Sequence, residues 1–367
     1  AAGVVPSIHS RKAEHIAIST SLDVEARVQA SWEDVALIHD CVPELDLDEV
    51  DLSVEFLGRR LGAPLMFSAM TGGHELAGSI NAVLAEVAEH FGLAMGVGSQ
   101  RAYVRDHSQA GSYVVVRELA PSAFVVANVG APQLIRQGAE PPLSLADVRS
   151  AVDLVRADAL AVHLNYLQEM IQPEGDTRAR GVLEAIAQVV RDSSVPVIAK
   201  ETGAGMSAAA ARRLAAAGVR ALDVAGAGGT SFAIVEAERA RLRDVPAKVH
   251  LGELFAGWGI PTTVSIPLAV GAGLPVIGSG GIRSGLDAAR ALALGATLVG
   301  VARPLLLVAQ QGVEATAGWV RQFLDELRTA LFLTGSRRPA DLPGKAAIVG
   351  HTRELLEAIR AAGGTSP

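Results

Sequence analysis

The feature that most constrains the fold is a unit that occurs eight times along the chain. Each unit begins with a short apolar segment, continues through a glycine-rich or polar turn, and leads into an alanine-rich stretch with helical spacing. The predicted strands span residues 64–68, 94–98, 124–128, 160–163, 195–199, 221–224, 274–278 and 296–300. Helical patterns between them cover residues 79–90, 144–155, 177–190, 207–217 and 284–294.

Strands that are apolar along their whole length, with helices between them, are typical of a parallel sheet buried on both faces. Eight units favour closure, because an open doubly wound sheet usually has fewer strands and often a glycine fingerprint at its first turn, which is absent here. We therefore predict an α/β fold, a (β/α)₈ TIM barrel over residues 62–330. Residues 1–61 would form an extension that packs on the barrel or on a neighbouring subunit, and residues 331–367 a helical tail with a helix at 352–361.

Composition narrows the classes of partner. Hydrophobic residues make up 50% of the chain and charged residues 19%, which excludes a disordered polar chain. With 32 Lys and Arg against 39 Asp and Glu, the net charge of −7 predicts no general attraction to nucleic acid or to an anionic membrane. The single cysteine, Cys41, excludes an intramolecular disulfide and favours a cytoplasmic location.

The turns after the last two strands indicate a phosphate site. In a barrel of this kind, ligands bind at the carboxyl ends of the strands, often with a phosphate near strands seven and eight. Gly280 and Gly281 follow the seventh strand, and Ala302 and Arg303 follow the eighth. Backbone N–H groups without side chains would cradle a phosphate there. The alternative is that the two glycines only permit a tight turn.

Lys200 ends the fifth strand and would place its ammonium in the barrel mouth. A buried ammonium needs an anionic or accepting partner, and the pyrimidine edge of a flavin supplies one. The alternative partner is Glu201, but neighbouring strand residues point to opposite faces. Asn128 and Thr230 would add hydrogen bonds to the same ring or phosphate.

A second anion signal follows the fourth strand. His163 and Asn165 lie on one side of the strand by their spacing, and the next turn would bring Gln168 and Glu169 over the same opening. Glu169 suits Mg²⁺, with waters and substrate phosphates as the other ligands. The alternatives are a packed core histidine and a solvated carboxylate at a helix start.

The positive charge for such an anion would come from the N-terminal cluster of Arg11, Lys12 and His15, with Arg101 as a further candidate. If that segment folds over the mouth of its own barrel or of a neighbour's, it supplies the charge that a diphosphate needs. Taken alone, a charge run is usually a solvated surface.

Taken together, the motifs resemble those of the type 2, FMN-dependent isopentenyl diphosphate isomerases. The resemblance extends from Arg11 to about Leu305 and rests on the joint order of separated motifs. These are Arg11-Lys12-x-Glu14-His15-Ile16, Met70-Thr71-Gly72-Gly73, Gly96-Val97-Gly98-Ser99-Gln100-Arg101, His163-Leu164-Asn165-x-x-Gln168-Glu169, Gln172-Pro173-Glu174-Gly175-Asp176, Lys200-Glu201, Gly228-Gly229-Thr230, Trp258-Gly259-Ile260-Pro261-Thr262 and Gly278-Ser279-Gly280-Gly281-Ile282-Arg283-Ser284-Gly285.

The resemblance implies an enzyme that interconverts isopentenyl and dimethylallyl diphosphate, with FMN, NADPH as reductant and Mg²⁺, and that forms homo-tetramers or homo-octamers. It implies flavin contacts from Ala69, Met70, Thr71, Ser99, Asn128, Lys200, Thr230, Gly280, Gly281, Arg283, Ala302 and Arg303, and a metal ligand in Glu169. It implies substrate contacts from Arg11, Lys12, His15, Ser99, Gln100, Arg101, His163, Asn165 and Gln168, of which His163, Asn165 and Gln168 are the catalytic candidates.

The chemistry agrees with this layout. Moving a double bond by one position adds a proton to one carbon and removes one from another, through a tertiary cation that a reduced flavin can stabilise. Gln168 is our candidate for positioning or relaying the proton, since an amide is a poor base. One departure is Phe232, where the family commonly has Trp, so a larger prenyl diphosphate stays open as a substrate.

Two other functions remain possible at this point. An FMN-dependent α-hydroxy-acid oxidase or dehydrogenase needs a base and an arginine pair for a carboxylate, whereas this sequence offers amides and a metal carboxylate. A flavin-binding module without catalysis is the second, because a fold alone does not prove activity. Aerobic oxidation of lactate or glycolate, compared with anaerobic isomerisation, would separate these functions.

Overall fold

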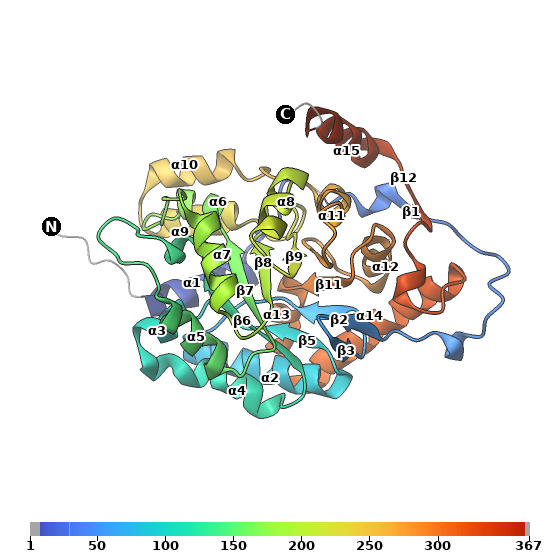
Figure 1. Ribbon diagram of the computed structural model, residues 1–367, viewed down its shortest axis with the longest axis horizontal. Helices are drawn as coiled ribbons and strands as arrows, with labels where there is room; N and C mark the ends of the chain where they lie inside the picture. Colours follow the sequence, from blue (N-terminus) through green and yellow to red (C-terminus); the bar gives the residue numbers. More distant parts are fainter. Residues whose placement is uncertain (1–7, 29, 364–367) are drawn as a thin grey trace.

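The computed structural model describes residues 8–28 and 30–363, with side chains from residue 11 onward. Eight parallel strands close into a barrel, because the first, β4, pairs with the last, β11 (Figure 1). The strands are β4 (Leu65–Phe67), β5 (Ala94–Gly96), β6 (Phe124–Gly130), β7 (Ala159–Leu164), β8 (Val197–Glu201), β9 (Ala221–Asp223), β10 (Val276–Ser279) and β11 (Leu298–Val301). The predicted (β/α)₈ barrel is confirmed, and strand ends differ from the predicted ones by at most two residues.

Helices follow the strands and cover the outside of the barrel. They are α2 (Glu75–Phe91), α3 (Arg101–Arg105), α4 (Gly111–Leu119), α5 (Leu145–Leu154), α6 (Tyr166–Ile171), α7 (Val182–Asp192), α8 (Ala208–Ala216), α9 (Phe232–Leu242), α10 (Pro246–Leu254), α11 (Thr262–Val270), α12 (Gly285–Ala293), α13 (Arg303–Ala309) and α14 (Val313–Leu333). The helix predicted from residue 177 begins later, because Gly181 takes a φ of +89° just before Val182. No helix among the described residues is both long and apolar enough to cross a membrane.

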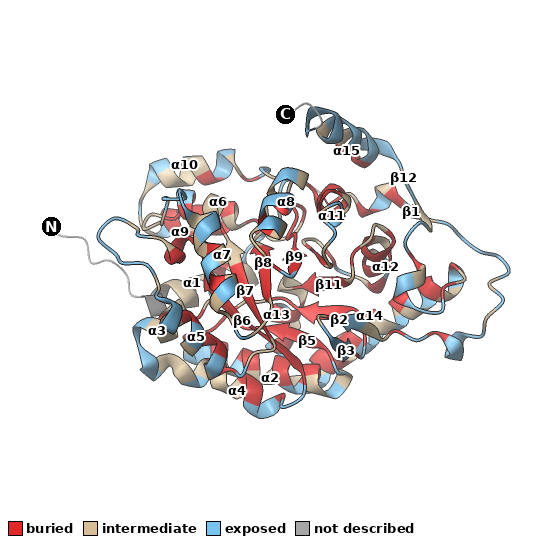
Figure 2. Cartoon of the chain, viewed as in Figure 1, coloured by how far each residue is buried: buried red, intermediate tan, exposed pale blue. Residues whose placement is uncertain are grey.

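The inside of the barrel is filled by apolar side chains of the strands. Met66, Phe124 and Ile277 are at most 2% exposed and belong to one buried cluster. The hairpin of β2 (Val54–Phe56) and β3 (Arg59–Leu61) closes the amino end, where Phe56 packs edge-to-face on Phe124 with ring centroids 5.6 Å apart. Figure 2 shows this buried interior surrounded by helices whose outer faces are exposed. Ligands are therefore confined to the carboxyl end of the barrel.

The N-terminal extension contains regular structure that the sequence did not predict. Helix α1 (Ile8–Ser21) packs against α9 and α13, and β1 (Val35–Leu37) pairs antiparallel with β12 (Ala346–Ile348) of the tail. The tail ends in α15 (Gly350–Gly363), which contains the predicted helix at 352–361. The domain limits at residues 61 and 330 stay predictions, and the second one falls within α14.

Candidate active site

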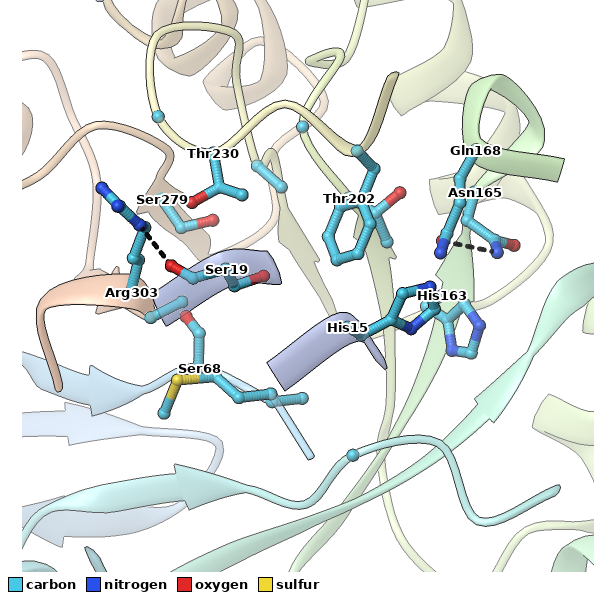
Figure 3. Close-up of a pocket in the computed structure, with 18 of the residues that line it drawn as sticks. His15, Ser19, Ser68, His163, Asn165, Gln168, Thr202, Thr230, Ser279 and Arg303 are labelled. Atoms are coloured by element: carbon cyan, nitrogen blue, oxygen red, sulfur yellow. Dashed lines mark hydrogen bonds between the residues drawn. The ribbon is translucent and has the colours of Figure 1, made fainter. Parts of the chain in front are cut away.

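A cavity of about 280 Å³ opens at the carboxyl ends of the strands, and the segments after all eight strands contribute to its wall (Figure 3). Helix α1 adds residues from above. Every predicted site residue except Gln100 lines this cavity: Arg11, Lys12, His15, Ala69, Met70, Thr71, Ser99, Arg101, Asn128, His163, Asn165, Gln168, Glu169, Lys200, Thr230, Gly280, Gly281, Arg283, Ala302 and Arg303.

Gln100 does not line the cavity, so the geometry lends its predicted substrate contact no support. Its fully buried side chain donates to the carbonyl of Ala151 at 2.7 Å and accepts from the backbone N–H of Asn128 at 2.9 Å. Both ends of the amide are therefore used to tie the segment after β5 to α5 and β6. Its position next to Ser99 and Arg101 suggested a contact with substrate, but the side chain is directed at Ala151 and the backbone of Asn128.

The loop that follows β9 and the loop that follows β10 pack against each other through their main chains at the rim of the cavity. Gly281 has a φ of +74°, and a Cβ on it would lie 2.6 Å from the carbonyl oxygen of Gly228. A Cβ on Gly280 would lie 2.1 Å from the carbonyl oxygen of Gly226. No side chain fits between these two loops, so they present main chain to the cavity, as a phosphate cradle requires.

Two arginines stand at the same rim and share one carboxylate. Arg303 donates to Glu25 at 2.8 Å, and Arg283 forms a second ion pair with Glu25. Arg303 also donates to the carbonyl oxygens of Ser19 at 2.8 Å and Leu22 at 3.1 Å (Figure 3). The predicted phosphate rim is thus joined to the last turn of α1 and to the segment that follows it.

Lys200 stands on the floor of the cavity beside a buried acid. Its partner in the strand register is Asp223, which is fully buried and accepts a hydrogen bond from Ser279 Oγ. Burial raises the pKa of Asp223, and the Lys200 charge opposes this effect. The Lys200 ammonium donates to the backbone oxygen of Glu201 at 3.0 Å. The cation at the floor of the cavity therefore lies beside an acid that is buried among the strands and does not line the cavity.

The Glu201 side chain points away from Lys200, as the strand alternation predicts. Its Oε2 accepts the backbone N–H groups of Thr202, Gly203 and Ala204 at 2.6–2.7 Å. Burial raises the pKa of Glu201 to about 7, although these three hydrogen bonds favour the carboxylate. No ion pair joins its carboxylate to Lys200 among the described contacts, and Glu201 instead shapes the loop that lines the cavity.

His163 is a neutral ring in this site. Burial first, and then the charges of Lys200, Lys12 and Arg101, lower its pKa to about 3. Its Nδ1 lies 2.8 Å from Asn128 Oδ1, and the Asn128 amide donates at 3.1 Å to the carbonyl of Val97. That orientation of the amide places the ring proton on Nδ1 and leaves Nε2 as an acceptor.

The segment after β7 forms a chain of amides and a carboxylate. Asn165 Nδ2 donates to Gln168 Oε1 at 3.1 Å and to Glu169 Oε1 at 3.0 Å (Figure 3). The backbone N–H of Asp176 donates to Glu169 Oε2 at 2.7 Å. Burial raises the pKa of Glu169, and the charge of Asp176 adds to this effect. A cation beside Glu169 would reverse that shift, because it favours the carboxylate.

Glu236 on α9 lies behind the cavity wall and contacts two residues that line it, and the sequence did not predict this role. Its fully buried Oε1 accepts from Gln168 Nε2 at 2.8 Å and lies 2.8 Å from His15 Nε2. Its Oε2 forms an ion pair with the fully buried Arg239. Burial opposes ionisation, but His15, Arg239 and Gln168 outweigh it and lower the pKa of Glu236 to about 2. The available signal in the sequence was a pair of opposite charges, Glu236 and Arg239, spaced three residues apart in an alanine-containing helix.

Helix α1 carries its basic cluster over the mouth of its own barrel. The Lys12 ammonium donates to the carbonyl of Ser99 at 2.7 Å, and His15 reaches Glu236. Glu14 pairs with Arg239 at 3.0 Å and with Arg243 at 2.8 Å. Within this chain, the basic cluster therefore lies at the mouth of the barrel to which it is covalently joined.

Arg101 lines the cavity but is already paired. Its two terminal nitrogens lie 2.9 Å from Asp176 and 2.9 Å from Glu140. A diphosphate there would share the guanidinium with these carboxylates.

The cavity suits the groups that the sequence predicted. Ser68 Oγ and Asn165 Oδ1 are buried at its wall and have no hydrogen-bond partner among the described residues, so a ligand in the cavity would satisfy them. The main-chain cradle suits a phosphate, and Lys200 suits an electron-rich ring edge. The described residues contain no group of three or more His, Cys, Asp or Glu side chains placed so that they could hold a metal ion. Mg²⁺ beside Glu169 would therefore need oxygens from substrate and water.

Comparison with known proteins supports the flavin and diphosphate site described above. The family model for FMN-dependent dehydrogenases matches residues 131–349. The isopentenyl-diphosphate delta-isomerase of Methanoregula boonei is 48% identical over 351 residues, which cover 95% of this chain and 96% of that protein. The chain belongs to this isomerase family. The enzyme of the same name from Methanothermobacter thermautotrophicus is 46% identical with the same coverage. The resemblance identified from the motifs is confirmed.

Among solved structures, this isomerase-family chain is similar to mandelate oxidase with bound benzoyl-formic acid. The TM-score is 0.61 at 19% identity, and the match covers 91% of this chain and 93% of that one. At this identity the likeness shows a shared barrel. The hydroxy-acid oxidase is therefore a distant structural relative.

Proposed function

We propose that the protein interconverts isopentenyl diphosphate and dimethylallyl diphosphate with reduced FMN. The observation that carries the proposal is one cavity with two anion rims, Gly280 and Arg303 on one side and Lys12 and His163 on the other. The two isomerases compared above, 48% and 46% identical over nearly the whole chain, support the same reaction. An α-hydroxy-acid oxidase finds support only in a distant likeness of fold.

When bound, reduced FMN supplies an electron-rich ring against the alkene and a nearby proton. The chain's residues would bind and orient the two anionic groups. Arg11 and Lys12 would attract the diphosphate from above, while Glu169 would hold Mg²⁺ against it. His163 would contact the diphosphate through Nε2 after this nitrogen takes up a proton, which the bound anion favours because it raises the low pKa of the ring.

Gln168 would orient the proton transfer. Gln168 Nε2 donates to the Glu236 carboxylate, and Gln168 Oε1 accepts from Asn165 Nδ2. The Gln168 amide is therefore held at both ends. Asn165 joins it to the metal carboxylate, and His15 shares the same Glu236 oxygen. Phe232, at the start of α9, lies edge-on to His15 with ring centroids 6.2 Å apart and completes an apolar wall.

The direct test starts with the purified protein, which should bind FMN and show a flavin absorbance spectrum. Under anaerobic conditions, with FMN, NADPH and Mg²⁺, it should convert isopentenyl diphosphate to dimethylallyl diphosphate without net oxidation. Aerobic oxidation of lactate or glycolate without isomerisation would favour the oxidase instead. A yellow protein inactive on every prenyl diphosphate would favour a binding module.

We expect the KM for isopentenyl diphosphate to rise with pH above about 7. Burial, and then the neighbouring Arg11 charge, lower the pKa of Lys12 to about 7. Below that pH the ammonium is present before substrate arrives. Above it, binding must take up a proton, so KM would rise by up to about tenfold per pH unit. Steady-state assays between pH 6 and 9 measure this.

A Lys12→Arg variant is the control for that pH profile, because a guanidinium stays charged across the range. Its KM should change less above pH 7 than the wild-type KM does. Identical profiles for the two proteins would refute the role of the Lys12 proton.

A Gly281→Ala variant should bind FMN at least about tenfold more weakly. Alanine is strained at a φ of +74°, and its Cβ would lie 2.6 Å from a backbone oxygen, so the rim must shift. Quenching of flavin fluorescence on titration with apoprotein measures the affinity. Gly318→Ala, in α14 with no atom within 4 Å of the new Cβ, should leave it unchanged. Equal affinities for both variants would contradict the cradle.

Magnesium, NADPH as the reductant, a homo-tetramer or homo-octamer and a cytoplasmic location belong to the same proposal. The buried Glu169 at the cavity supports the metal. Loss of isomerisation on chelation, dependence on the reductant and the mass of the native protein in solution test the first three.

A further inference from the structure

Tyr113 on α4 lies below the turn that follows the first barrel strand. Its side chain is fully buried. A Cβ on Gly72 would lie 2.2 Å from Tyr113 Cε1, and a Cβ on Gly73 would lie 3.1 Å from the Tyr113 hydroxyl. The ring therefore occupies the space that side chains on this turn would need, and the two motif glycines make room for it.

The hydroxyl of Tyr113 belongs to a closed triangle of hydrogen bonds. It donates to the carbonyl of Ser99 at 2.7 Å. The Lys12 ammonium donates to the same carbonyl at 2.7 Å and to the Tyr113 hydroxyl oxygen at 2.9 Å. The directions follow from chemistry, because an ammonium only donates and the phenol has one hydrogen. Burial raises the pKa of Tyr113, so it stays a neutral phenol that can play both parts.

This triangle leaves the ammonium ready for an anion. Lys12 has three N–H bonds, and two of them are directed at acceptors on the barrel. Among the described residues no acceptor is given for the third, which remains for an oxygen in the cavity that Lys12 lines. The side chain is long and would lose much rotamer freedom on ordering. Holding it before ligand arrives removes that loss from the binding step.

We propose that Tyr113 is a positioning residue whose hydroxyl holds the Lys12 ammonium for the diphosphate of the substrate. The inference rests on the proposed function and extends it to a residue outside the cavity wall. It separates two roles of Tyr113: the ring supports the glycine turn, and the hydroxyl serves Lys12.

Tyr113→Phe tests the second role alone, because it keeps the ring. The variant should show a KM for isopentenyl diphosphate about tenfold higher, the scale of one lost hydrogen bond to a charged group. Its kcat should stay within about twofold of wild type, and its affinity for FMN should be unchanged. Tyr103→Phe is the matched control, since that hydroxyl pairs with Ser150 at 2.9 Å, and its KM should equal that of wild type.

A double variant distinguishes action through Lys12 from a structural effect. Lys12→Met should itself raise KM, and adding Tyr113→Phe to it should raise KM no further. Calorimetric titration with inorganic pyrophosphate gives the same comparison without turnover, so it is informative even if the isomerase reaction is not observed.

Three results would overturn the inference. The first is a Tyr113→Phe protein with wild-type KM and pyrophosphate affinity. The second is an equal effect of Tyr113→Phe with and without Lys12, which would assign the hydroxyl a structural role. The third is a Lys12→Met protein that binds pyrophosphate as well as wild type does, which removes the anion site itself. Absence of isomerisation together with the expected pyrophosphate pattern would contradict the proposed reaction and leave the Tyr113 assignment supported.

Discussion

A Gln168→Ala enzyme is expected to turn over isopentenyl diphosphate at least about 100-fold more slowly than wild type, with unchanged affinity for FMN. Positioned groups that assist proton transfer contribute effects of this size. The Gln168 amide is held by Asn165 at one end and by Glu236 at the other, so alanine removes both connections. Anaerobic initial rates at saturating substrate, with the flavin spectrum as a measure of binding, give the two quantities.

Gln322→Ala is the matched control for this change. Gln322 lies on the exposed side of α14 and donates only to Glu326 among the described contacts, at 3.0 Å. Its loss should leave kcat unchanged. If Gln168→Ala also keeps wild-type turnover, Gln168 has no part in the reaction.

The second large effect is expected at Glu236, where alanine should lower the free energy of unfolding by about 3–5 kcal/mol. Breaking a buried ion pair from one side leaves the other charge without full compensation. Arg239 is fully buried and would keep only the partly exposed Glu14 and Glu174. Urea unfolding of the two proteins measures the difference.

Glu236→Gln separates stability from catalysis, because it keeps the volume and one accepting oxygen. We expect it to fold and to bind FMN, with a kcat at least about tenfold lower, since Gln168 and His15 lose their shared carboxylate. The pKa of Glu236 is lowered from 4.5 to about 2, so its stabilising effect is present above pH 4.5 and is lost as pH falls toward 2. The stability difference between wild type and this variant should shrink over that range.

Glu238→Ala on the same helix is the control. Glu238 is partly exposed and pairs with Arg241 three residues away, an arrangement that contributes less than about 1 kcal/mol. A Glu236→Ala protein no less stable than Glu238→Ala would show that the buried network contributes little.

The barrel could be predicted because its strands are apolar on both faces, a pattern that few other folds require. The cofactor and diphosphate residues could be predicted because they directly follow those strands, where a barrel gathers its ligands. Gln100 shows the limit of this rule: it follows a strand too, but its amide serves the backbone of α5 and β6.

What escaped prediction lies one step behind the cavity. Glu236 and Tyr113 sit within helices and reach the site through Gln168 and Lys12, and no local periodicity marks such a contact. Helix α1 was missed for a related reason. It lacks a continuous apolar face, because its polar side chains are directed at partners more than 80 residues away in sequence.

The contacts that attach α1 to the barrel also affect how a ligand enters the cavity, because residues of α1 line it. Its buried apolar side chains among those described are Ile16 and Ile18, whereas Lys12, Glu14 and His15 hold it to the barrel through charged and polar contacts. Lifting this cover would expose two isoleucine side chains and would break hydrogen bonds and ion pairs with the barrel. Because Glu236 and Arg239 are fully buried, salt would screen their contacts with α1 only weakly, so the cover would stay attached to the barrel over a wide range of ionic strength.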